Sequence, residues 1–325
     1  MNRIKYPWLK KYVEHFDINK LAHSHLLSGK TGIGKLHFAE ELSKSLLCSN
    51  SNELFEYCND CSSCKAFNAG SHPDFKLIDK EKETKIIKIS QLRGNSKEKG
   101  DEGILNISHE TPLLSKSKII VINSAESMNL ESQNFLLKTL EEPSKNTFIF
   151  LISSKPFSLK PTLLSRLNHT SFSFPNKEGI SLWINSLGIE LNSKDLNFFE
   201  NLNLTEINQD QIKKGKEERK EFSYELSESS SSKKLEKIAS NWDDQFLSIK
   251  LGWLSKIILQ SIFVKINKTE IPTSYFSDNI LHLSKTKNLT ELFALSNELN
   301  NLSKDLSKGI NLNNKIQIKA FLSTF

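Results

Sequence analysis

One segment near the N-terminus has the residue types and spacing of a phosphate-binding loop. It is the run Gly29, Lys30, Thr31, Gly32, Ile33, Gly34, Lys35 and Leu36. Because it joins an apolar run to a helical pattern, backbone N–H groups and a helix N-terminus can surround a phosphate, with Lys35 reaching the outer oxygens. The Ser or Thr that would hold Mg²⁺ after this lysine is replaced by Leu36. The segment predicts a P-loop fold and leaves nucleotide binding open.

The acidic pair of an ATPase is absent from the position where the spacing predicts it. An active site of this kind has one acid for the metal and one that polarises water, at the end of the third strand. Here that strand ends in Asn123 and Ser124, and Glu126 comes two residues later. We expect Glu126 to be a solvated residue at a helix entry that points away from the site. With Leu36, Asn123 and Ser124 in these places, ATP hydrolysis by this chain is not expected.

The four cysteines of the chain form one cluster, with the spacing C-x9-C-x2-C-x2-C. They are Cys48, Cys58, Cys61 and Cys64. Such clustering favours a metal over disulfides in a reducing compartment. Four thiolates suit tetrahedral Zn²⁺, which would be structural because protein ligands fill every position. Free cysteines and an iron–sulfur cluster are the alternatives, and no His or acidic ligand is needed.

Arg166 follows the fourth predicted strand and lies at the end of a short helical segment. From such a position an arginine can reach a neighbouring subunit and stabilise a transferring phosphate in trans. A surface ion pair is the alternative interpretation of a single arginine.

The first half of the chain alternates apolar runs with helical patterns, which predicts an α/β fold. Continuous apolar runs are typical of strands covered on both faces, as in a parallel sheet with crossover helices. The expected strands cover residues 25–28, 74–79, 118–123, 147–153 and 170–174. Helices are expected over about 33–47, from 89, over 130–140 with Phe135, Leu136 and Leu140 inward, and over 161–166.

After Pro175 strand patterns nearly vanish and amphipathic helices follow one another. They are expected over residues 177–187, 193–201, 211–227, 233–242, 247–266, 274–283 and 289–306, with a last one ending near 325. We therefore expect a P-loop domain over residues 1–175 that carries the cysteine module (48–64), a helical lid over 176–212, and an all-α C-terminal domain over 213–325.

Composition limits the remaining function classes. The net charge of +6 is mild and does not identify a nucleic-acid binder by itself. A zinc-containing DNA-binding module is a weaker alternative, because residues 48–64 are poor in the Lys, Arg and aromatic residues used for readout. No stretch approaches the roughly 18 apolar residues of a membrane span, and the N-terminus lacks a signal-peptide core. We expect a soluble, cytoplasmic protein.

In their order along the chain, these features resemble the bacterial clamp-loader AAA+ subunits. The shared segments are the P-loop, the cysteine module, Ala69 to Asp74 (AGSHPD), Leu136 to Pro143 (LLKTLEEP), and Leu164-Ser165-Arg166. The cysteine module and the LLKTLEEP helix also occur in the gamma/tau motor subunits. The depleted ATP site and the short chain, without a long extension after the third domain, favour the delta-prime type of DNA polymerase III.

This resemblance implies an AAA+ core, a small lid, and a collar that oligomerises with other loader subunits. It implies a hetero-pentamer with gamma/tau motor subunits and delta, in which a rigid, non-hydrolysing stator helps to place the sliding clamp on primed DNA. The chain would then belong to a DNA-directed DNA polymerase holoenzyme, a nucleotidyltransferase, without being catalytic by itself. The alternative is an ATP-hydrolysing gamma/tau-type motor subunit.

The resemblance also assigns roles to single residues. Arg166 would be offered to the ATP of an adjacent motor subunit, with Leu167 in place of the cysteine of the Ser-Arg-Cys motif. Ser153 and Ser154 match the sensor threonines at the end of the fourth strand. Residues 203–211 contain no Gly-Ser-x-Arg sensor motif, which is a further sign against self-contained hydrolysis.

Overall fold

A computed structural model describes residues 4–81, 84–94, 103–104, 110–141, 146–189, 203–205, 209–227, 244–271, 274–307 and 314–324. The chain forms two compact units. The first comprises Met1–Trp183 and Asn203–Glu206, and the second comprises Ile184–Leu202 and Ile207–Phe325. The expected three-domain division, at residues 175 and 212, stays a prediction.

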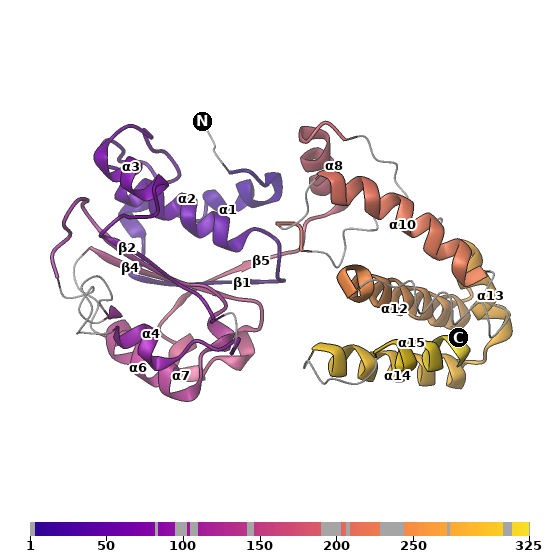
Figure 1. The fold of residues 1–325 in the computed structure, drawn as a ribbon. Helices are drawn as coiled ribbons and strands as arrows, with labels where there is room; N and C mark the ends of the chain where they lie inside the picture. The colour runs from indigo at the N-terminus through magenta and orange to yellow at the C-terminus, as the bar shows by residue number, and fades with distance from the viewer. Residues whose placement is uncertain are drawn as a thin grey trace. The chain divides into compact units, whose positions relative to one another are not determined.

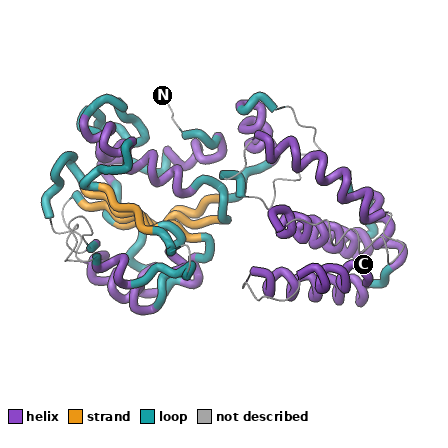
Figure 2. The backbone as a smooth tube through the Cα atoms, viewed as in Figure 1, coloured by secondary structure: helices purple, strands orange, loops and turns teal. Residues whose placement is uncertain are grey.

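A five-stranded parallel sheet forms the centre of the first unit (Figures 1 and 2), with the order β2-β3-β4-β1-β5. Its strands are β1 (Ser24–Gly29), β2 (Phe75–Ile78), β3 (Lys118–Ile122), β4 (Thr147–Ser153) and β5 (Asn168–Phe172). Each neighbouring pair runs parallel, and Leu26 of β1 is opposite Leu151 on one side and His169 on the other. The predicted α/β class is therefore confirmed. Since all strands point the same way, their carboxyl ends share one edge, where ligands bind in such sheets.

Helices cover both faces of this sheet (Figure 1). One face carries α1 (Lys10–Val13) and α2 (Lys35–Leu47), and the other carries α4 (Ile89–Arg93), α6 (Leu130–Glu141) and α7 (Pro161–Leu164). On the α2 face, Phe38 lies 5.1 Å from Phe172 and 4.9 Å from Phe55, measured between ring centroids. On the other face, Leu136 and Leu140 of α6 join the buried strand residues, with Phe135 packed against them. This two-sided burial explains why the strands are continuous apolar runs.

Most predicted elements of the first unit agree with the observed ones within a few residues, and two differences have clear causes. The fifth strand begins at Asn168 rather than at Thr170, because this edge strand starts with exposed polar residues that give no apolar signal. The helix α3 (Ser62–Asn68), which lies within the cysteine module, was not predicted because it lacks apolar periodicity. Short 3-10 turns occupy Pro7–Leu9, Ile18–Lys20, Ala125–Ser127 and Pro156–Ser158.

The described part of the second unit consists of helices joined by turns and loops. Its helices are α10 (Gln209–Ser227), α12 (Asp244–Asn267), α13 (Ser277–Thr286), α14 (Leu289–Ser307) and α15 (Asn314–Thr324), while α8 (Lys177–Ser186) crosses the boundary between the units. The helix α12 packs against α13 and α14, and α15 packs on α14. The helices predicted over 193–201 and 233–242 lie outside the described residues. Among the described residues, no helix is long and apolar enough to span a membrane.

Candidate nucleotide pocket, cysteine cluster and surface arginine

The P-loop residues connect the end of β1 to the start of α2. The loop runs from Gly29 to Gly34, and Lys35 is the first residue of the helix. Gly34 is the N-cap and has φ +91°, where a Cβ atom would lie 2.6 Å from Cδ2 of Tyr6. The indole N–H of Trp8 donates to the carbonyl of Ile33 (2.9 Å). The N-terminal aromatic residues therefore hold the loop from outside, a role that the sequence analysis did not identify.

The side chain of Lys35 is buried and folded against its own loop. Its Nζ donates to the carbonyl oxygens of Gly29 (2.7 Å) and Lys30 (2.6 Å). Burial lowers the pKa of Lys35 to about 8, and the negative charge of Glu126 opposes this shift. The ammonium predicted to reach outer phosphates thus binds loop carbonyls in this structure.

A cavity of about 500 Å³ lies beside the loop at the carboxyl edge of the sheet. Leu36 lines it with an apolar side chain where a hydroxyl would hold Mg²⁺. Asn123 follows β3 and donates from Nδ2 to Oδ2 of Asp79 (2.9 Å). Other lining residues are Tyr6, Thr31, Gly32, Gly34, Lys35, His37, Glu40, Lys80, Ser124, Glu126, Ile152, Ser154, Asn203 and Thr205. The pocket therefore unites the P-loop with the ends of β2, β3 and β4.

The expectation that Glu126 is solvated and points away from the site is wrong. Ser124 adopts a left-handed conformation (φ 55°), and the following 3-10 turn brings the half-buried Glu126 to the pocket wall. The Glu126 carboxylate accepts hydrogen bonds from the backbone N–H (3.2 Å) and the hydroxyl (2.5 Å) of Ser154. Burial raises the pKa of Glu126, but hydrogen bonds from Ser154 and Ser153 outweigh it, so the pKa lies below its usual value. An anionic carboxylate is thus present in the pocket at neutral pH.

A short segment of the first unit, residues 203–205, lies against the P-loop. Both the backbone and the side chain of Asn203 approach Gly32 so closely that a Cβ atom at residue 32 would overlap them. The Asn203 side chain accepts from the hydroxyl of Thr205 (2.6 Å), which keeps this segment turned toward the loop. Only a glycine at position 32 permits this approach.

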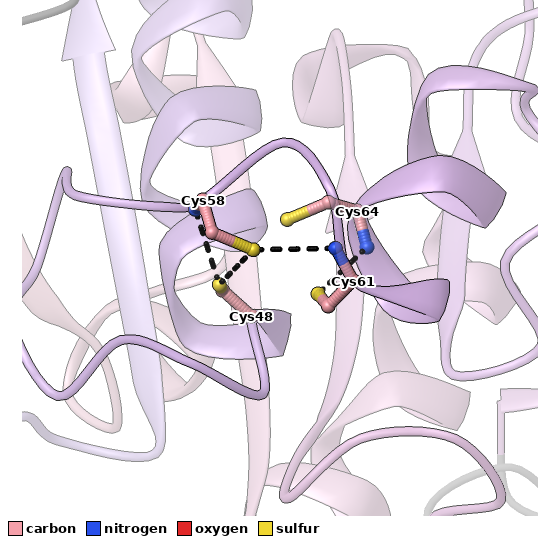
Figure 3. A group of neighbouring side chains, drawn as sticks. All are labelled: Cys48, Cys58, Cys61 and Cys64. Carbon is pink, nitrogen blue, oxygen red and sulfur yellow. Dashed lines mark hydrogen bonds between the residues drawn. The ribbon is translucent and has the colours of Figure 1, made fainter.

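The four cysteines predicted to bind a metal come together in the structure (Figure 3). All four sulfur atoms lie within 4.8 Å of one another, and those of Cys48 and Cys58 are 3.7 Å apart. A tetrahedron with metal–sulfur bonds of 2.3 Å has edges of about 3.8 Å. Backbone N–H groups also point at the sulfurs, with Cys61 N 3.3 Å from Cys58 Sγ and Cys64 N 3.4 Å from Cys61 Sγ. The donor set and its spacing fit a tetrahedral metal ion.

The thiols differ in acidity because their surroundings differ. Backbone N–H groups of Cys61 and Asp60 lower the pKa of Cys58 to about 6, which favours a thiolate at neutral pH. Burial raises the pKa of Cys64 to about 12. Because a bound metal requires thiolates, metal binding would release the proton of Cys64.

The Gly-Ser-His-Pro-Asp stretch connects the cysteine module to the sheet. Nε2 of His72 is 2.9 Å from the hydroxyl of Ser63 in α3, and Nδ1 accepts from the backbone N–H of Asp74 (3.0 Å). The buried Asp74 carboxylate accepts from the backbone N–H groups of Leu113 (2.7 Å) and Leu114 (2.8 Å). These residues served in the sequence analysis only to establish the resemblance, and the structure gives them this connecting role.

Arg166 lies just beyond α7 with its guanidinium at the surface of the first unit. Its Nη1 donates to the carbonyl of Thr162 (2.7 Å), and its Nη2 donates to Oε1 of Glu141 (2.7 Å) at the end of α6. Glu141 belongs to the LLKTLEEP segment, so two of the motifs that carry the resemblance meet here. Leu167 is buried and anchors the turn.

Two family models match this chain. Residues 5–176 match the family described as "DNA polymerase III, delta subunit", and residues 213–325 match "DNA polymerase III, delta subunit, C terminal". The first match alone covers more than half of the chain.

Individual relatives agree with these models. The chain is 34% identical to DNA polymerase III subunit delta' of Pseudomonas aeruginosa over 50% of this chain and 47% of that protein. It is 33% identical to subunit delta' of Bacillus subtilis over 53% of this chain and 48% of that protein. It is 32% identical to subunit tau/gamma of Haemophilus influenzae over 46% of this chain and 20% of that protein. The chain thus spans about half the length of the two delta' relatives. It belongs to the family described as DNA polymerase III, delta subunit.

Proposed function

We propose that the chain is a delta-prime subunit of a DNA polymerase III clamp loader, which assembles with gamma/tau motor subunits and delta and helps to load the sliding clamp onto primed DNA. In this role it does not hydrolyse ATP and acts as a stator. Family membership and the two delta' relatives support this identity. The family also supports a cytoplasmic location and a division into a P-loop domain (1–175), a lid (176–212) and a collar (213–325).

The proposal rests mainly on a difference between the pocket and the surface of this chain. The pocket lacks metal-binding groups at positions 36 and 123, whereas Arg166 lies at the surface. Leu36 offers no oxygen ligand, and the amide of Asn123 is held by Asp79. Lys35 already has two carbonyl partners in the loop. Arg166 has its guanidinium at the surface and can meet a phosphate outside this chain. We propose that it acts on the ATP of a neighbouring motor subunit.

Coexpression tests the assembly part of the proposal. Tagged chain, produced together with gamma/tau and delta from the same organism, should elute with both in one complex on size exclusion. A variant without residues 213–325 should lose this complex, since the proposed collar holds the subunits together. A full-length chain that elutes alone in the presence of both partners would contradict the assignment.

A hydrolysing gamma/tau-type motor subunit is the second candidate, because Glu126 lines the pocket and Lys35 is retained. Titration calorimetry with Mg·ATP and a turnover assay on the purified chain separate the two candidates. The stator proposal predicts that the wild type shows no steady ATP turnover. The variants Lys35→Ala and Glu126→Gln, assayed in parallel, should then be indistinguishable from it. Turnover that both variants abolish would establish the motor function instead.

For the cysteine cluster we propose a structural Zn²⁺ held by Cys48, Cys58, Cys61 and Cys64. The spacing of the sulfurs and the N–H groups directed at them support this assignment. Such an ion would stabilise the module without taking part in chemistry, because protein ligands fill every position. Metal analysis of the purified chain should give stoichiometric zinc. Iron together with visible absorbance would instead indicate a cluster.

A further inference from the structure

A buried lysine connects α2 to both halves of the cysteine module. Lys44 lies near the C-terminal end of α2, four residues before Cys48, and is 8% exposed. Its Nζ donates to Oδ1 of Asn59 and to Oδ1 of Asn68, both at 2.6 Å. It also lies 4.1 Å from the ring centroid of Tyr57. A buried ammonium requires such partners, because without them the loss of its hydration would be uncompensated.

The partners of Lys44 are next to the metal ligands in sequence and in space. Asn59 follows Cys58 and has φ 63°, a left-handed conformation that Asn tolerates better than most residues. Asn59 also lies two residues before Cys61, the N-cap of α3. Asn68 is the last residue of α3, the helix that carries Cys64.

Tyr57 completes this connection. Its ring packs against the cluster formed by Cys48 and Cys64, with Cys61 at its side. Its hydroxyl donates to Oε2 of Glu41 (2.9 Å), one helical turn before Lys44 on α2. Two side chains of α2 therefore bind the loop that carries the second, third and fourth cysteines.

We propose that Lys44, although it is not a ligand, is a positioning residue for the metal site. By binding the side-chain oxygens of Asn59 and Asn68, it fixes the turn after Cys58 and the end of α3, and so sets the separation of Cys58 and Cys64. Groups that orient ligands from outside the coordination sphere typically change metal affinity about 10- to 100-fold. The proposal rests on the assignment of zinc to the four cysteines.

The chain provides a matched control in Lys65. This lysine also lies in the module, and its charge acts on Cys58 and Cys61. Unlike Lys44 it is exposed, and its Nζ pairs with Asp60 (2.9 Å) at the surface. Lys44→Met and Lys65→Met therefore each remove one positive charge from the module, but only the first removes hydrogen bonds to Asn59 and Asn68.

The test is chelator competition for zinc on the full chain, together with the visible spectrum of the Co²⁺-substituted protein. Lys44→Met should bind zinc about 10- to 100-fold more weakly than wild type, and its Co²⁺ ligand-field bands should shift at full occupancy. Lys65→Met should retain wild-type affinity and spectrum. If both variants bound zinc equally weakly, the loss of positive charge would explain the effect and the positioning role would be refuted. Wild-type zinc affinity in Lys44→Met would also overturn the proposal.

A second variant keeps the test decisive if Lys44→Met does not fold. Asn59→Gly preserves the left-handed turn at an exposed residue but removes the oxygen that Lys44 binds. It should lower zinc affinity in the same direction, whereas unchanged affinity would contradict the proposal. The metal content of the wild type distinguishes failure of the zinc assignment from failure of the role proposed for Lys44. A wild-type protein without zinc would refute the zinc assignment itself.

Discussion

At the scale of single residues, Arg166 is held at its position by weak contacts. Its partner Glu141 is half exposed, and exposed ion pairs contribute only about 0–1 kcal/mol to stability. A phosphate from another subunit can therefore replace Glu141 at low cost, while the contact with the Thr162 carbonyl keeps the guanidinium in place. The ion pair orients the arginine before assembly and is weak enough to leave its proposed role possible.

Asp74 provides a stability prediction at the same scale. Asp74→Asn should destabilise the chain by about 2–3 kcal/mol, because hydrogen bonds to a charged acceptor are lost. Burial raises the pKa of Asp74, but the N–H groups of Leu113, Leu114 and Ser115 outweigh it and lower the pKa below its usual value. Urea unfolding of both proteins measures the difference.

The pH dependence of this difference has a defined sign. Because the folded pKa is below the unfolded value of about 3.9, the stabilisation is complete above that value and is lost as the pH falls through the folded pKa. Wild type should therefore exceed Asp74→Asn by a constant amount from pH 7 to 5, and the gap should narrow below about pH 4. A gap that persists undiminished into strong acid would show that the carboxylate charge is not responsible.

Residue roles that depend on tertiary contacts are the ones that sequence reasoning missed. The residues of the P-loop and of the cysteine cluster were recognisable from local spacing, whereas the role expected for Arg166 came from the resemblance to a known family. The placement of Glu126 was not, because it depends on a left-handed turn at Ser124 and on Ser154, which is 28 residues away. The pairing of Arg166 with Glu141 likewise joins the ends of two helices 25 residues apart.

At the scale of elements, the start of α2 should be sensitive to any side chain at Gly34. Gly34→Ala should cost about 1–3 kcal/mol, since φ +91° is unfavourable for alanine and the new Cβ would meet Tyr6. Gly252→Ala is the matched control: it lies within α12 with open space around it, and should stabilise by about 0.5–1 kcal/mol. Thermal unfolding checks both, and a neutral Gly34→Ala would show that the loop geometry is not constrained.

The cysteine module should depend on its metal in the same way. Cys61→Ser should release zinc and lower the unfolding temperature of the first unit, since structural zinc in small peptides supplies apparent binding energies of about 10–16 kcal/mol. The neighbouring exposed Ser62→Ala is the control and should retain zinc. Chelator should then destabilise wild type and Ser62→Ala but leave Cys61→Ser unchanged. Equal responses of all three would exclude a stabilising metal.

The predictability of the elements followed the strength of their apolar patterns. Strands β3 and β4 are buried along nearly their whole length, and their bounds were predicted within one residue. The exposed strand β5 was shifted by two residues, and α3 was not predicted, because its residues (SSCKAFN) form no apolar stripe. Apolar patterns thus predict an element well where both of its faces are buried, and poorly where its residues are exposed or polar.

At the scale of the whole molecule, the chain combines an α/β unit with a helical unit. The first contains the P-loop pocket, the cysteine cluster and Arg166, and the second contains long helices of the region that matches the C-terminal family model. This separation fits the proposed division of labour, in which one part presents residues to a neighbouring ATP site and the other part holds the assembly together.

ATP turnover by the assembled loader tests the central claim most directly. Loader reconstituted with Arg166→Ala should elute at the same size as the wild-type complex but lose the DNA-stimulated turnover of the site that Arg166 serves, since an arginine supplied in trans contributes about 10³–10⁵ to phosphoryl transfer in well-studied cases. Lys160→Ala, which removes another cation near this surface, is the control and should leave turnover unchanged. An intact Arg166→Ala complex with wild-type turnover would contradict the account.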